Sequence, residues 1–126
     1  IGQNDLKPEL AKNQISSKVK IGLSITDLDQ IQNIPNFINY IGVGPIFPTN
    51  SKTDASNAMG ELILEEIIKK VDIPVVAIGG IKLKNINKLK CMGVSGFAMI
   101  SEIFSSIDPE KKFKEFKKIA KWKKIF

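Results

Sequence analysis

Apolar residues along the chain occur either in short continuous runs or at helical spacing. The segment 74–78 is almost wholly apolar, which is typical of a parallel strand buried on both faces. Asp27 is a suitable N-cap for a helix that stops before Pro35, and Pro8 fits the first turn of a helix that begins near Leu6. In total, the pattern predicts strands over 19–24, 39–44, 74–78 and 96–101, and helices from about 6, from 27 to 34, over 60–71, 85–92 and about 109–126.

Each predicted strand is followed by a helix, which predicts right-handed βαβ units and a parallel sheet. A doubly wound sheet would need a glycine-rich turn after its first strand, but Gly42 and Gly44 lie within the second strand without a third glycine. Gly79-Gly80 after the third strand and a short helix after the fourth instead match a barrel's phosphate site. We therefore expect one α/β domain over 1–126, a (β/α)8 TIM-barrel type in which the chain covers roughly strands 5–8.

A half-barrel would expose two strand edges and its interior. The strand pattern predicts that this interior is lined by apolar side chains. We therefore expect the chain alone to be marginally folded or self-associated, or to pair with a missing N-terminal half-barrel. The residues expected to line the interior are Ile21, Ile41, Val43, Val75 and Ala77.

Composition removes several kinds of chemistry. The chain has 126 residues and no histidine, so histidine triads and histidine metal sites are excluded. Its single cysteine, Cys91, fits a reducing compartment and predicts a cytoplasmic location. No apolar run approaches the roughly 20 residues that cross a bilayer, so no membrane partner is expected.

The formal net charge is +6, and most of it lies near the C-terminus. Residues 108–126 hold eight lysines and three acidic residues. An amphipathic helix of this kind could bind RNA or an acidic membrane. The favoured interpretation is a terminal helix packed on the domain with a solvated lysine face, so a nucleic-acid partner is unlikely.

Polar residues and glycines gather where the predicted strands end. Parallel strands place their ligands at the carboxyl ends, and glycines and helix N-termini there suit a phosphate group. Asp5 is a hard carboxylate suited to magnesium. Together these positions predict a phosphorylated ligand beside a metal-bound pyrophosphate. Each position also has a structural explanation: Asp5 could cap a helix, Ser24 and Ser101 could end strands, and Lys52 could be a surface cation.

Five segments together resemble the thiamine-phosphate synthase family, C-terminal half. They are IGQNDL (1–6), IGLS (21–24), IGVGPIFPTNSK (41–52), PVVAIGGI (74–81) and GFAMIS (96–101). The resemblance implies a (β/α)8 barrel that joins hydroxymethylpyrimidine diphosphate to thiazole phosphate with Mg²⁺, and releases pyrophosphate and thiamine phosphate.

The resemblance also implies roles for individual residues. Asp5 is similar to one of two magnesium carboxylates, and Ser24 and Lys52 are similar to the catalytic residues that contact the pyrimidine diphosphate. Lysine and magnesium would stabilise negative charge on the leaving group. The residues similar to the thiazole-phosphate contacts are Thr49, Asn50, Ser51, Gly80, Ile100 and Ser101.

Departures from the family pattern keep other functions open. Thr26 stands where family members usually carry a histidine, and the segments that supply the second magnesium carboxylate and the basic diphosphate contacts are not in the sequence. The alternatives are an inactive remnant or thiazole-phosphate binding module of the same fold, and a protein similar to thiazole tautomerase. The tautomerase lacks the full GPIFPT-x-x-K segment, so the sequence argues against it.

Overall fold

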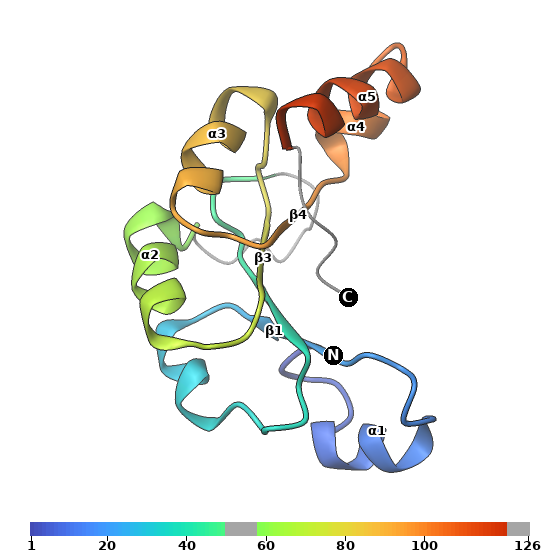
Figure 1. Cartoon of the computed structure of the whole chain (residues 1–126), viewed down its shortest axis with the longest axis vertical. Coiled ribbons are helices and arrows are strands. Elements are labelled where there is room, and N and C mark those ends of the chain that lie inside the picture. Colours follow the sequence, from blue (N-terminus) through green and yellow to red (C-terminus); the bar gives the residue numbers. More distant parts are fainter. Residues whose placement is uncertain (50–57, 121–126) are drawn as a thin grey trace.

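The computed structural model describes residues 1–49 and 58–120 of the chain (Figure 1). Short strands alternate with helices along most of this length. In chain order the elements are α1 (Pro8–Gln14), β1 (Gly22–Ile25), the 3-10 helix η1 (Leu28–Asn33), β2 (Tyr40–Val43), α2 (Gly60–Lys70), β3 (Val75–Ile78), α3 (Leu83–Cys91), β4 (Gly96–Ala98), α4 (Ser101–Phe104) and α5 (Pro109–Ala120). The predicted α/β fold is confirmed.

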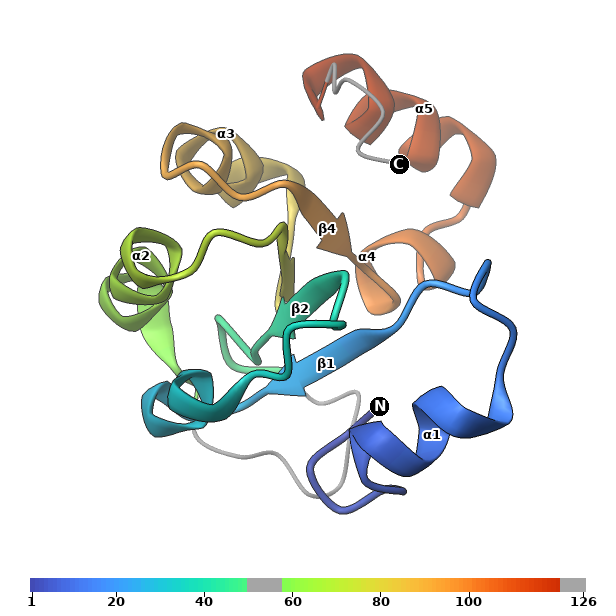
Figure 2. The same cartoon turned by 60° about the horizontal axis from the view of Figure 1, so that its bottom comes forward.

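The four strands form one parallel sheet in the order β1-β2-β3-β4 (Figure 2). Each strand therefore pairs with the strand that comes next along the chain. Among the described strands the order never reverses, whereas a doubly wound sheet has a reversal point. The doubly wound alternative is thus excluded for this part of the chain.

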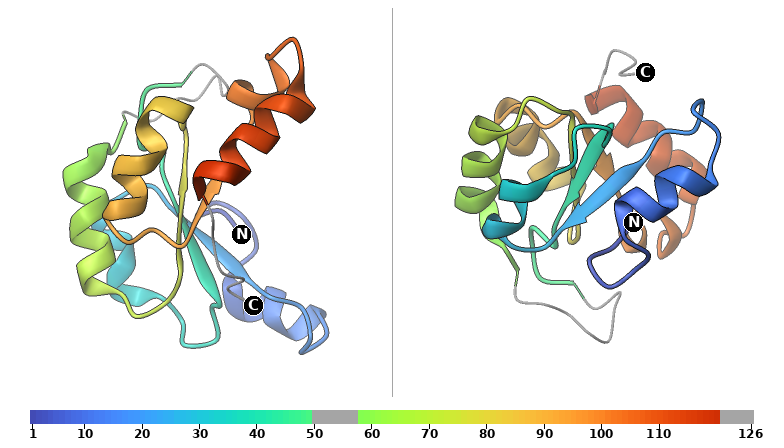
Figure 3. Two further views of the ribbon diagram at one scale, coloured as in Figure 1. Left: turned by 45° about the horizontal axis from the view of Figure 1, so that its top comes forward. Right: turned by 90° about the horizontal axis from the view of Figure 1, so that it is seen from below.

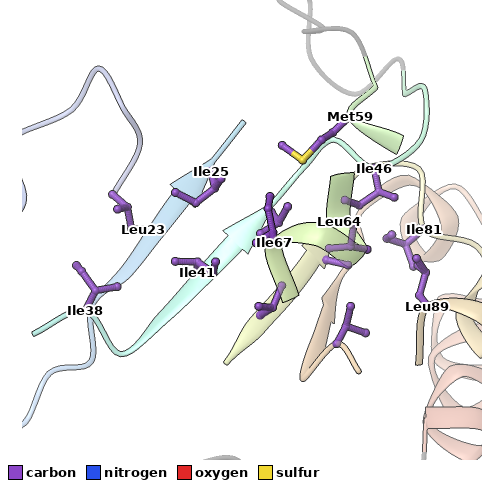
Figure 4. Close-up of a cluster of buried hydrophobic side chains, with 14 of the residues drawn as sticks. Leu23, Ile25, Ile38, Ile41, Ile46, Met59, Leu64, Ile67, Ile81 and Leu89 are labelled. Atoms are coloured by element: carbon purple, nitrogen blue, oxygen red, sulfur yellow. The ribbon is translucent and has the colours of Figure 1, made fainter. Parts of the chain in front are cut away.

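One face of the sheet is covered by α2, α3 and η1 (Figure 3). Strand register aligns two apolar rows on this face, Leu23–Ile41–Val75 and Ile25–Val43–Ala77, all of them buried. Leu64 and Ile67 of α2 pack against these rows and are fully buried (Figure 4). Burying one such side chain contributes about 1.5–3 kcal/mol, so this layer supplies most of the hydrophobic stabilisation.

The opposite face of the sheet has a different composition. Ser24, Gly42 and Val76 lie in one row across β1, β2 and β3, and Ser24 is exposed. A β-carbon built on Gly42 would meet no atom within 4 Å, so this face is open above β2. The five residues expected to line an exposed interior do not lie on this face, so that expectation is wrong. They are Ile21, Ile41, Val43, Val75 and Ala77.

All five residues of that expected set belong to the buried core on the helix side. Side chains alternate between the two faces of a strand, and the register assigns these residues to the covered one. The open face carries small residues such as Ser24 and Gly42 together with Tyr40 and Ile78.

Several element boundaries differ from the sequence pattern. Asp27 caps its helix as predicted, with its side chain accepting a hydrogen bond from the Asp29 N–H, but the helix is a 3-10 helix. The fourth strand ends at Ala98, and Ser101 is the first residue of α4 instead of a strand end. The lysine-rich helix α5 is described up to Ala120, and the rest of the predicted range lies outside the described residues.

The helices α1 and α5 lie toward opposite ends of the sheet (Figures 2 and 3). Phe116 of α5 is buried, and the Lys90 Nζ of α3 donates a hydrogen bond to the Ile119 carbonyl at 3.2 Å. The predicted docking of the lysine-rich helix on the domain is confirmed for this part. No helix within the described residues is long and apolar enough to cross a membrane.

Both end helices also carry exposed apolar side chains. On and beside α1 these are Leu6, Leu10, Ile15 and Val19. On and beside α4 and α5 they are Ile100, Phe104, Ile107 and Phe113. Phe104 is 73% exposed, a high value for a side chain of this size.

Candidate functional site

The segment that follows β2 continues along β3 beyond the end of the strand pair. The Ile46 N–H donates to the Ile78 carbonyl at 2.9 Å, and the Phe47 N–H donates to the Gly79 carbonyl at 3.1 Å. The Met59 N–H in turn donates to the Pro45 carbonyl at 2.8 Å, which ties the start of α2 to the same segment. The carboxyl ends of β2 and β3 are therefore joined, with Thr49 two residues beyond the contact.

Glycine is required at both positions of the Gly79-Gly80 pair. Gly79 has φ +88° and Gly80 has φ +65°, in the left-handed region that favours glycine. A β-carbon on Gly79 would lie 2.5 Å from Cβ of Pro45, and one on Gly80 would lie 2.5 Å from Cβ of Phe47. The pair is thus explained by backbone conformation and packing, whereas the sequence analysis explained it by phosphate access.

Asn85 of α3 holds the loop that follows these glycines. Its Nδ2 donates to the Gly80 carbonyl at 3.1 Å, and its Oδ1 accepts from the Lys82 N–H at 2.9 Å. Sequence analysis missed this residue. An Asn in the first turn of a helix that follows a glycine loop is the signal that could have found it, because Asn side chains commonly bond nearby backbone groups.

The Asp5 loop lies against the end of β1. Gln3, which the sequence analysis did not single out, donates from Nε2 to the Ser24 carbonyl at 2.6 Å. The Gly2 N–H donates to Oδ2 of Asp5 at 2.6 Å. The N-cap of α1 is Lys7, so Asp5 does not cap this helix and the simplest structural explanation of Asp5 is wrong.

The donor set for a metal ion is small. Within residues 1–49 and 58–120, no group of three or more His, Cys, Asp and Glu side chains could hold a metal. Mg²⁺ often binds proteins through one or two carboxylates, with substrate phosphates completing its oxygen ligands. Asp5 is exposed and fits such a site as a single ligand, provided that the remaining ligands come from a substrate or another segment.

Ile100 and Ser101 lie at the same edge as the glycine pair. Ile78 and Ala98 are partners in the β3–β4 register, so Gly80 and Ile100 each come two residues after a paired position. Ile100 is the N-cap residue of α4, and its carbonyl accepts from the Phe104 N–H at 2.9 Å. Ser101 is exposed at the start of this helix.

The strands are parallel, so their carboxyl ends meet at one edge of the sheet. The residues that lie along this edge are Asp5 and Ser24 at β1, Thr49 beyond β2, Gly80 beyond β3, and Ile100 with Ser101 beyond β4. Asn50, Ser51 and Lys52 lie outside the described residues. The position of the candidate site at the carboxyl edge follows from the topology, while the role of each residue stays a prediction.

The fold and this edge define a β/α protein whose candidate ligand residues follow successive parallel strands. The family model for thiamine monophosphate synthase matches residues 1–103. The chain therefore belongs to the thiamine monophosphate synthase family, as the sequence motifs indicated.

Individual relatives agree with this assignment. A thiamine-phosphate synthase from Histophilus somni is 41% identical over 119 residues, 91% of this chain and 53% of that protein. One from Limosilactobacillus reuteri is 41% identical over 123 residues, 96% of this chain and 57% of that protein. A thiamine phosphate pyrophosphorylase structure from Pyrococcus furiosus superposes with a TM-score of 0.79 at 32% identity, over 96% of this chain and 57% of that one. The chain thus spans a little over half the length of these relatives.

Proposed function

We propose that this chain forms the C-terminal half of a thiamine-phosphate synthase site, which condenses hydroxymethylpyrimidine diphosphate with thiazole phosphate. The observation that carries the proposal is the common edge of Asp5, Ser24, Gly80 and Ser101, in a chain that belongs to the synthase family. The products are thiamine phosphate and pyrophosphate. The cytoplasm remains the predicted location.

In this proposal the sheet is strands 5–8 of a (β/α)8 barrel. The unreversed strand order supports this, because barrel strands pair in sequence. The outer edge of β1 adds support: the Ile1 amine donates to the Gly22 carbonyl at 2.7 Å, and the Ser24 N–H donates to the Ile1 carbonyl at 2.8 Å. These two bonds have the pattern of a parallel bridge, which a preceding strand would continue.

The partner in this proposal is the complementary N-terminal half-barrel. It would pair with the edges of β1 and β4 and cover the exposed apolar side chains around α1, α4 and α5 described above. Self-association is the other way to cover these surfaces. A second copy carries the same +6 charge, which opposes close approach and favours the complementary half.

The proposed roles follow the chemistry of each group. Asp5 would hold Mg²⁺, which supplies positive charge beside the diphosphate leaving group. Ser24 and Lys52 would bind the diphosphate of the pyrimidine substrate, with the lysine stabilising negative charge that develops in the transition state. Thr49, Asn50, Ser51, Gly80, Ile100 and Ser101 would hold the phosphate of the thiazole. Fixing the thiazole nitrogen near the methylene carbon that carries the diphosphate makes the reaction effectively intramolecular: the N–C bond forms at this carbon as its bond to the diphosphate oxygen breaks.

A second candidate is a thiazole-phosphate binding module of the same fold. The proposed site residues favour the binding module. Every proposed thiazole-phosphate contact lies in this chain, whereas Asp5 is the sole carboxylate proposed for the metal. Such a module would bind thiazole phosphate and release no pyrophosphate.

The test compares the chain alone with the chain joined to the N-terminal half of the Histophilus somni relative. We expect pyrophosphate release only from the joined protein with both substrates and Mg²⁺. Lys52→Ala in that protein should lower kcat at least tenfold and leave the Kd for thiazole phosphate within about twofold, since the lysine acts on the leaving group. Lys84→Ala, an exposed lysine of α3, is the control.

The outcomes separate the two candidate functions. Thiazole-phosphate binding without turnover in the joined protein would favour the binding module. Equal affinity for thiazole and thiazole phosphate, measured by calorimetry, would contradict both.

A further inference from the structure

We propose that Asn85 is a positioning residue for the phosphate of the thiazole substrate, an inference that rests on the proposed function. The half-buried Asn85 side chain bonds two backbone groups of one loop. One is the carbonyl of Gly80, and the other is the N–H of Lys82. Asn85 thereby holds the stretch between β3 and α3 at Gly80 and at Lys82.

The bond to Gly80 sets the direction of a peptide group. In a trans peptide the carbonyl and the N–H point in opposite directions. With the Gly80 carbonyl held toward Asn85, the N–H of Ile81 in the same peptide is directed away from it. Backbone N–H groups held in a fixed direction after a strand are suitable donors to a phosphate oxygen.

The Phe47 N–H holds the Gly79 carbonyl, so the peptide before Gly80 is fixed by the backbone, whereas the peptide after it depends on other contacts. Gly80 has no side chain, and its left-handed φ of +65° is a conformation that an unrestrained glycine leaves easily. Phe47 blocks movement on one side, because even a β-carbon on Gly80 would lie 2.5 Å from it. Ile81 is buried and anchors the next residue in the core. Asn85 supplies the remaining restraint, a hydrogen bond to the Gly80 carbonyl itself.

Helix capping alone does not require both bonds. The capping function needs an acceptor for the Lys82 N–H, which the Oδ1 atom provides. Donation from Nδ2 to Gly80 is a separate interaction, which an aspartate of the same shape would lose. The two functions of Asn85 can therefore be separated by substitution.

The experiment measures thiazole-phosphate binding in the joined protein carrying Asn85→Asp, Asn85→Ala or the control Asn87→Ala. Asn87 is an exposed asparagine on the same helix. We expect Asn85→Asp and Asn85→Ala to raise the Kd for thiazole phosphate about tenfold, the size of one lost hydrogen bond that orients a charged ligand. The Kd for unphosphorylated thiazole and the KM for the pyrimidine diphosphate should change less than twofold.

Together the two Asn85 variants exclude two simpler causes of weaker phosphate binding, which are loss of the helix cap and charge repulsion. Asn85→Asp keeps the capping acceptor and should melt within 2 °C of the unsubstituted protein, so loss of the cap would not explain its weaker binding. Asn85→Ala adds no charge, so repulsion of the phosphate would not explain its effect. Asn87→Ala should match the unsubstituted protein in every measurement.

Two results would overturn the inference in distinguishable ways. If the unsubstituted protein binds thiazole phosphate and Asn85→Asp binds it equally well, Asn85 is a helix cap alone and the proposed function stands. If the unsubstituted protein does not prefer the phosphorylated thiazole, the proposed function fails and this inference fails with it.

Discussion

The two faces of the sheet differ in what they contribute. The face toward α2 and α3 is packed with aliphatic side chains such as Ile41 and Val75, which are 0% and 3% exposed. The opposite face carries Ser24, Gly42 and Val76 in the same strands, one residue out of phase. The buried apolar layer of the sheet thus lies on one side, and the other side is less densely packed.

The difference between the two faces explains how a chain with about half the length of its relatives has a regular fold. The buried core on the helix side draws on strands and helices that are adjacent along the chain. The exposed apolar side chains of the described residues lie mainly on and beside the end helices, at positions such as Leu10 and Phe104. Stability and completeness of the site are therefore separate properties of this chain.

The largest expected effect tests the difference between the faces directly. Ile41→Ala should lower the free energy of unfolding of the 126-residue chain by about 2–5 kcal/mol, because it leaves a cavity against α2. Val76→Ala, on the open face of the adjacent strand, should cost less than about 1 kcal/mol. Urea denaturation followed by circular dichroism measures both. Equal losses would show that the open face is also packed in solution.

A smaller loss of stability is expected when a glycine in or just after β2 is replaced by alanine. A β-carbon on Gly44 would lie 2.1 Å from the Ile78 carbonyl oxygen, so Gly44→Ala must shift the backbone and should cost about 1–3 kcal/mol. Gly42→Ala meets no atom within 4 Å and should stay within about 0.5 kcal/mol of the parent chain. Thermal unfolding of the two variants checks this. A large cost at Gly42 would mean that the open face is covered.

The smallest effect is expected on the solvent side of the helix layer. A hydrogen bond and the positive charge of Lys69, 2.7 Å away, lower the pKa of the exposed Glu65 carboxyl below its usual value. A carboxyl with a lowered pKa in the folded state adds stability above its unfolded pKa and loses it as pH falls through the folded pKa.

Glu65→Gln should therefore lower the Tm by a degree or less near pH 7 and not at all near pH 2, since surface pairs contribute little. Glu9→Gln on α1 serves as the control. A drop in Tm for Glu65→Gln that persists at pH 2 would assign the effect to something other than this ion pair.

Much of the fold follows from local sequence signals. The Asp27 cap, the proline at the start of α1 and Gly93 with φ +97° after α3 act at the predicted places. The assignment of faces could not be predicted, because Pro74 to Ile78 is apolar at every position and carries no alternation. Either Val75 or Val76 could face the helices, and the pairing of β3 with β2 decides between them. This pairing joins residues more than thirty positions apart in the chain.

Residue type alone suggests chemistry for Asp5, Ser24 and Ser101, and the structure places these residues near strand ends while their roles stay predictions. The candidate site was not predictable where a side chain acts on backbone groups. Gln3 bonds the Ser24 carbonyl and has no sequence signal that separates it from an ordinary surface residue. Asn85 bonds the Gly80 carbonyl, and its place in the first turn after a glycine loop signals a backbone contact without identifying the partner. The packing reason for Gly79-Gly80 was also missed, because it depends on Pro45 and Phe47, more than thirty residues earlier.

The strand order has a consequence for how the sheet can form during synthesis on the ribosome. Among the four described strands, each pairs with its neighbours in sequence, so a newly emerged strand finds its partner already outside the exit tunnel. Domains begin to form from the N-terminal side while translation continues. The β1–β2 pair can therefore serve as a template for β3, and β3 for β4, with no strand waiting for a distant segment. The sheet therefore grows at one edge, that of the newest strand, while the outer edge of β1 stays in place.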